Sequence, residues 1–175
     1  MVKNKKLYFG NYKIKCAIGK RGISKNKREG DNSTPSGTYG FKSIYYRKDR
    51  IKNIKTKLKK ICIKKNMGWC DDSKSKFYNK KIEFPFKYNA EKLYKRSNVY
   101  DLIIVINYNM RMTKKNKGSA IFLHIANRKY NSTQGCIAVS KKNIKIIASL
   151  INNRSKIEIN ITTITTGYLY CFWYY

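Results

Sequence analysis

The sequence has few histidines, few acidic residues and no long apolar segment. Of its 175 residues only His124 is a histidine, so one imidazole is available for proton transfer near neutral pH. No apolar run approaches the ~20 residues that span a bilayer. The first ten residues also lack the apolar core of a secretory signal peptide. We therefore expect no transmembrane segment.

The cysteines do not follow a metal-binding or disulfide pattern. There are five, which is odd, and no C-x-x-C occurs. They cannot all pair within one chain, and a zinc ribbon is not expected. The count alone leaves a Cys3His metal site open, although the spacings give it no support. We expect reduced thiols.

Acidic residues are scarce in a chain that is very basic. Nine Asp and Glu face 40 Lys and Arg, which gives a net charge of +31. One interpretation is a polyanionic partner, bound by a basic module without chemistry. The other is a compositional bias towards Lys, Asn and Ile. The charge is spread along the chain without a basic arm or a nucleic-acid motif, so we favour the second and expect no specific nucleic-acid partner.

The chain is long enough for one domain with a real core, and we assign residues 1–175 to a single domain. Its patterns predict a mainly β fold with one or two short helices. The apolar run 102–107 predicts a strand buried on both faces. Ser140 can cap a helix over 141–151. Further strands are expected within 7–19, at 38–46 and at 156–161, and a short helical turn is expected at 90–94. Segment 47–66 is ambiguous between helix and strand. The tail 168–175 is interpreted as a last strand or a packing tail.

One stretch brings together the residue types that acyl transfer needs. An apolar run leads into His124, residues 127–134 read as a loop, and an apolar run follows Cys136. An imidazole beside a thiol can take its proton and return it to a leaving amine. The N–H groups of Gly135 and Cys136 could then stabilise an oxyanion. On spacing alone, a lone histidine and a lone cysteine are more often structural.

Several further segments match the motifs of one family in the same order along the chain. Together they favour a catalytic interpretation of the histidine and the cysteine over a structural one. The stretch Ser132–Ile137 (STQGCI) resembles the S/T-x-G-C motif of the L,D-transpeptidase (YkuD-like) catalytic domain family. The chain is closer to a branch that carries a G-SAIF-x-H strand, matched by Gly118–His124. Three further segments of that branch are matched, by Asn26–Gly37 (NKREGDNSTPSG), by WCDD with YN, and by AE with YD. The resemblance runs from about residue 19 to 151 and implies a single-domain β-sandwich.

The resemblance implies a cysteine enzyme that needs no cofactor or metal. Cys136 would be the nucleophile, His124 the base, and Gly135 part of the oxyanion site. The residues that could contact substrate are Thr133, Gln134, Trp69, Asp71, Tyr78 and Arg128. Asp71 could position a substrate amine, and Arg128 a substrate carboxylate. The sequence departs from the wider family at Gln134, where a second histidine is common, and at Ala138, where Arg or Asn is common.

The implied substrates are peptidoglycan stem peptides or muropeptides. Attack on a stem tetrapeptide would release the terminal D-alanine, and the thioester would pass to an amine, giving a 3→3 cross-link, or to water, giving an L,D-carboxypeptidase. We expect a monomer in the periplasm or cell wall, with the cytoplasm as the alternative.

Overall fold

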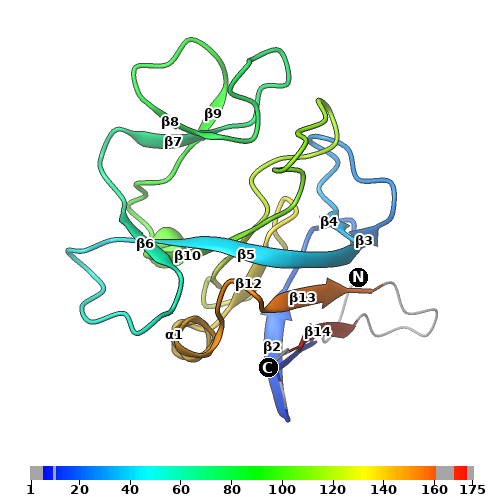
Figure 1. The fold of residues 1–175 in the computed structure, drawn as a ribbon, viewed down its shortest axis with the longest axis vertical. Coiled ribbons are helices and arrows are strands. Elements are labelled where there is room, and N and C mark those ends of the chain that lie inside the picture. Colours follow the sequence, from blue (N-terminus) through cyan, green and yellow to red (C-terminus); the bar gives the residue numbers. More distant parts are fainter. Residues whose placement is uncertain (1–5, 10, 161–167, 173–175) are drawn as a thin grey trace.

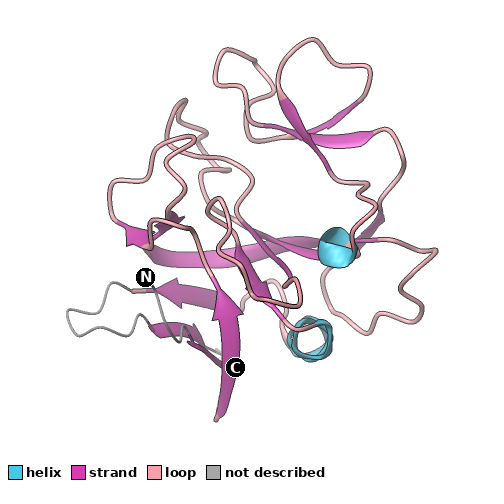
Figure 2. Cartoon of the chain, turned by 180° about the vertical axis from the view of Figure 1, so that it is seen from behind, coloured by secondary structure: helices cyan, strands magenta, loops and turns pink. Residues whose placement is uncertain are grey.

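The computed structural model describes residues 6–9, 11–160 and 168–172. As predicted, the protein is mainly β. Its described helices are α1 (Lys141–Leu150) and a single 3-10 turn, η1 (Asn98–Tyr100). A small sheet stands apart from the strands that carry the two chain ends (Figures 1 and 2).

The strands follow the chain from one end to the other. They are β1 (Lys6–Phe9), β2 (Tyr12–Ala17), β3 (Ile23–Ser24), β4 (Thr34–Pro35), β5 (Gly37–Tyr46), β6 (Lys59–Cys62), β7 (Met67–Cys70), β8 (Lys81–Glu83), β9 (Ala90–Lys92), β10 (Leu102–Ile106), β11 (Phe122–Ile125), β12 (Ile137–Val139), β13 (Lys156–Ile159) and β14 (Tyr168–Phe172).

The large sheet closes on itself around the core. Its strand order is β10-β11-β12-β2-β1-β14-β13-β5-β6, and β5 pairs in addition with β10. The ten-residue strand β5 makes this closure possible, because residues 37–40 pair with β13 and residues 41–46 pair with β10. The separate small sheet has the order β8-β7-β9.

Strand β10 is buried on both faces, as its continuous apolar run predicted. Successive side chains of a strand point to opposite faces. Leu102 and Ile104 accordingly join the main core, whereas Ile103 and Val105 join a second cluster that includes Trp69 of the small sheet. The site described below lies on this second face.

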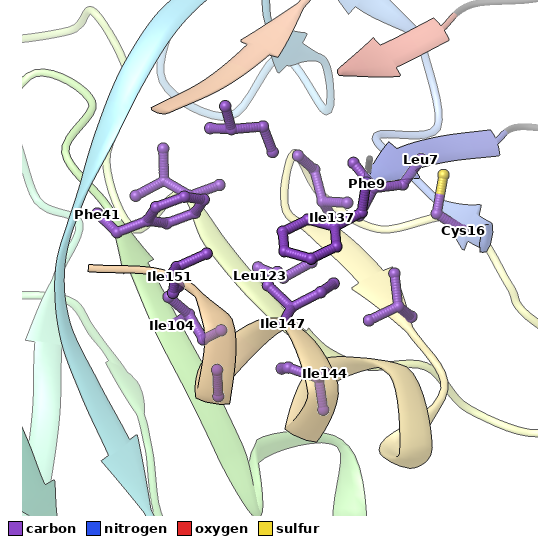
Figure 3. Packing of buried hydrophobic residues seen from close by; sticks show 14 of the residues in the cluster. Leu7, Phe9, Cys16, Phe41, Ile104, Leu123, Ile137, Ile144, Ile147 and Ile151 are labelled. Carbon is purple, nitrogen blue, oxygen red and sulfur yellow. The ribbon is translucent and has the colours of Figure 1, made fainter. Parts of the chain in front are cut away.

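Helix α1 closes the main core. The Ser140 side chain accepts a hydrogen bond from the Asn143 N–H at 3.1 Å, which confirms the predicted cap. Ile144 and Ile147 are buried and point from the helix toward Leu123 and Ile104 of the sheet (Figure 3). Burying such side chains stabilises the fold by ~1.5–3 kcal/mol each.

Some local predictions were wrong or incomplete. Residues 90–94 do not form a helical turn, because pairing with β7 holds Ala90–Lys92 as β9. The ambiguous segment 47–66 contains β6 and otherwise irregular chain. The segment 156–161 is a strand over β13, but β14 follows it and pairs with both β13 and β1. Within the described ranges, no helix has the length and apolarity to cross a membrane.

Candidate active site

Two adjacent parallel strands bring His124 and Cys136 to one face. β11 and β12 pair in parallel, with His124 opposite Ala138. Cys136 lies two residues before Ala138, so its side chain is on the same face as that of Ala138 and His124. Both residues line one cavity of about 250 Å³. The loop over 127–134 joins the two strands, as predicted.

The Cys136 thiol is protonated at rest. Its Sγ–H donates to the carbonyl oxygen of Ala120 at 3.1 Å, and its Sγ accepts the Phe122 N–H at 3.4 Å. Burial raises the pKa of Cys136 to about 12, and the negative charge of Glu91 adds to this. Burial has this effect because it disfavours the thiolate. The side chain therefore needs a base to become a nucleophile.

The His124 imidazole is neutral at rest. Its Nδ1 lies 2.9 Å from the Ile125 carbonyl oxygen. A carbonyl only accepts, so Nδ1 carries the proton and Nε2 is the atom that can take another. Burial lowers the pKa of His124, while the carbonyls of Ile125 and Val99 and the charge of Glu91 oppose that change. The resting pair is thus a thiol and a neutral imidazole.

Tyr100 contacts both members of this pair. Its ring packs edge-on against the His124 imidazole, with centroids 5.2 Å apart, and its hydroxyl donates to Glu91 Oε1 at 2.8 Å. Lys95 Nζ donates to the same oxygen at 2.7 Å. Burial raises the pKa of Tyr100 well above its usual value, with the nearby Cys136 and Glu91 adding to the shift. Neither Tyr100 nor Glu91 had a predicted role, although Glu91 belongs to the AE motif and Tyr100 to the YD motif.

Thr34 and Thr133 fix the loop that carries the cysteine. Thr34 Oγ1 accepts from Gly19 N at 2.9 Å and donates to the Gly135 carbonyl oxygen at 2.8 Å. Thr133 Oγ1 donates to the Cys136 carbonyl oxygen at 2.6 Å and accepts from Gly135 N at 3.1 Å. The expected oxyanion donor Gly135 N–H is therefore engaged within the loop at rest.

Gly135 could not be another residue without distortion. Its φ is +141°, in the region that favours glycine, and a Cβ there would lie 2.8 Å from the Ser33 carbonyl oxygen. Ala120, whose carbonyl holds the thiol, has a φ of +50°. A non-glycine residue in that region stores strain, which is common next to functional groups.

The other residues proposed from the sequence fall into two groups. Thr133, Gln134 and Asp71 line the cavity. Three others, Trp69, Tyr78 and Arg128, lie outside its lining. Trp69 is buried and donates from Nε1 to Asn79 Oδ1 at 3.0 Å, and Tyr78 is buried and donates to Glu29. Arg128 is exposed. Trp69 and Tyr78 thus support the walls of the site.

The cavity has an acidic wall. Glu29, Asp71 and Glu91 all line it, together with Ser119. Burial raises the pKa of Asp71, and the charges of Glu29, Glu91 and Asp72 raise it further. Three of the chain's nine acidic residues therefore gather at one cavity in a protein of net charge +31. Composition gave no indication of this grouping.

Comparison with known families gives one match. The family model of the L,D-transpeptidase catalytic domain (YkuD) matches residues 1–159. Neither the curated proteins nor the solved structures gave a match. The family model covers most of the chain and includes both strands that carry His124 and Cys136. The chain therefore belongs to the L,D-transpeptidase catalytic domain family.

Proposed function

We propose that this protein is a cysteine acyltransferase that acts on the tetrapeptide stems of peptidoglycan. The observation that carries the proposal is the shared cavity of Cys136 and His124, which presents a thiol and a neutral imidazole to one bound substrate. Family membership supplies the substrate class. Such substrates lie in the periplasm or cell wall, where we propose that the protein acts.

In the first half-reaction the thiol attacks a peptide carbonyl. Nε2 of His124 accepts the proton as Cys136 Sγ bonds to the carbonyl carbon of the third stem residue. Proton transfer must accompany attack, because burial makes the free thiolate very scarce. The C–N bond then breaks, and His124 gives the proton to the amino group of the departing D-alanine. A thioester on Cys136 remains.

The developing oxyanion requires donors in the cysteine loop. The Gly135 N–H is bonded to Thr133 at rest, so the Cys136 N–H is the donor available first. Each such donor contributes ~2.7–4 kcal/mol to the barrier reduction. Glu91 stabilises the imidazolium that forms during the reaction, because its negative charge favours the protonated ring.

The experiment is incubation of the purified protein with disaccharide-tetrapeptide, followed by mass spectrometry. A thioester adduct on Cys136 with loss of D-alanine is the expected intermediate. A tetrapeptide-tripeptide dimer identifies 3→3 cross-linking, and free tripeptide identifies the L,D-carboxypeptidase. Neither adduct nor product with correctly folded protein would refute the proposal.

A further inference from the structure

Two of the three carboxylates in the acidic wall lack a cationic partner among the described residues. The carboxylates of Glu29 and Asp71 form no ion pair within the described part of the chain, although the protein has 40 basic residues. Glu91, by contrast, is paired with Lys95 at 2.7 Å. Both side chains are half-buried, and partial burial of a carboxylate is costly unless a cation meets it. A cationic group in the cavity would offset that cost.

Two buried polar atoms at this wall also lack a partner. Ser119 is only 7% exposed and lines the cavity, and its Oγ has no hydrogen-bond partner. The neighbouring Tyr78 hydroxyl, whose pKa burial and Glu29 raise, is already bonded to Glu29 and to Gly118 N. Asp71 Oδ1 is the second such atom. Buried polar atoms are nearly always bonded, so unpaired ones beside a cavity indicate a missing ligand.

The acidic wall is shared by two cavities. Glu29 and Asp71 also line a second, neighbouring cavity of about 440 Å³, with Asn89 on its wall. The two carboxylates thus stand where the second cavity meets the one that holds Cys136. A molecule entering past Asn89 would place a cationic end between the carboxylates and the sulfur. Among the described residues, no group of three or more His, Cys, Asp or Glu could hold a metal ion.

We propose that Asp71, Glu29 and the Ser119 hydroxyl form the subsite for the primary amine of the acyl acceptor. This inference rests on the proposed function, because an acceptor amine is needed only when Cys136 carries a thioester. An ammonium group donates three hydrogen bonds, and two carboxylates with one hydroxyl can accept all three. The subsite directs the thioester to an amine in preference to water.

The transfer step balances with the groups present. The bound ammonium gives one proton to the Asp71 carboxylate, which its raised pKa makes a better acceptor. The freed amine attacks the thioester carbonyl, so the C–N bond forms as the C–S bond breaks. The second amine proton passes through His124 to the sulfur and restores the thiol. Asp71 then releases its proton to solvent.

The test uses disaccharide-tetrapeptide as donor and Nα-acetyl-L-lysine amide as acceptor, whose only charge is its side-chain ammonium. The ratio of amide product to hydrolysis product is measured by mass spectrometry over a range of acceptor concentrations. This ratio does not depend on how fast the thioester forms. Asp71→Asn should require about tenfold more acceptor to reach the wild-type ratio, as loss of a charge-assisted hydrogen bond predicts. Glu29→Gln should act in the same direction.

The matched control is Glu83→Gln, which removes the same charge from an exposed side chain on β8 that pairs with Lys81. Its ratio should equal that of the wild type. Asp71→Asn is isosteric and relieves repulsion, so its melting temperature should not fall. Equal ratios in wild type and Asp71→Asn, with the thioester present in both, would overturn the subsite alone. Absence of any thioester in the wild type would instead overturn the proposed function on which it rests.

Discussion

The Cys136 thiol donates a hydrogen bond to the Ala120 carbonyl oxygen, 3.1 Å away, and not to His124. The imidazole meanwhile bonds the Ile125 carbonyl through Nδ1. The two side chains share a cavity, yet each is held by backbone. This arrangement keeps the sulfur protonated at rest.

Removing either member of the pair should abolish the reaction without unfolding the protein. Cys136→Ala leaves no atom to form the thioester, and His124→Ala leaves no base for a thiol with a pKa of about 12. We expect no adduct and no product from either variant, measured by mass spectrometry, with circular dichroism like that of the wild type. Undiminished turnover by Cys136→Ala would rule out the thioester mechanism.

Thioester formation should depend on pH through His124 alone. Burial lowers the pKa of the imidazole below its usual 6.5, and only the neutral ring can accept a proton. The acylation rate should therefore rise as pH increases through that lowered pKa and stay level at neutral and mildly alkaline pH, because the thiol titrates near 12. The measurement is the pre-steady-state rate of adduct formation against pH. A rate that keeps rising tenfold per unit between pH 7 and 9 would show that free thiolate is the reacting species.

Tyr100→Phe should slow acylation while preserving the ring packing on His124. The variant loses the hydroxyl that bonds Glu91 and lies beside Cys136. Glu91 then moves more freely and stabilises the imidazolium less. We therefore expect about a tenfold lower acylation rate, which is the loss typical of one hydrogen bond to a charged group. The acidic limb of the pH–rate profile should also move to lower pH. Tyr45→Phe is the control, because Tyr45 is buried in the same cluster but does not line the cavity. Equal effects of both variants would assign Tyr100 to packing only.

Thr34→Val should destabilise the fold and misplace the cysteine loop. The change leaves the Gly19 N–H and the Gly135 carbonyl unpaired in a fully buried position. Each unsatisfied group costs ~1–3 kcal/mol, so the free energy of unfolding in urea should fall by about 2–6 kcal/mol in total. Thr34→Ser keeps the hydroxyl and should lose far less. If the two variants are equally stable, the bridge between these segments contributes nothing.

Gly135→Ala should cost more stability than Gly30→Ala. Both glycines have positive φ, at +141° and +73°, but a Cβ at Gly135 would meet the Ser33 carbonyl at 2.8 Å, whereas one at Gly30 meets nothing within 4 Å. Gly30→Ala should therefore lose only the ~1 kcal/mol that a positive φ costs a residue with a Cβ. Gly135→Ala should lose that amount and a further amount from the clash with the Ser33 carbonyl. Urea denaturation of both variants measures the difference; equal losses would mean that the loop can shift aside.

Short-range patterns in the sequence predicted several elements of this fold correctly. The apolar run 102–107 predicted β10, Ser140 predicted the start of α1, and the alternation at 156–161 predicted β13, because these signals act within a few residues. The motifs around His124 and Cys136 led to the family that the comparison then showed. Residues 90–94 were mispredicted because their strand exists only through pairing with β7.

The construction of the site depends on contacts between segments that are distant in the sequence. The protonated thiol follows from burial and from the Ala120 carbonyl, which lies 16 residues away in the chain. The acidic wall joins Glu29, Asp71 and Glu91, which come from three separate segments. In the sequence these are three acidic residues among many lysines. They become one feature because strand pairing and packing bring distant segments together, and no local pattern carries that information.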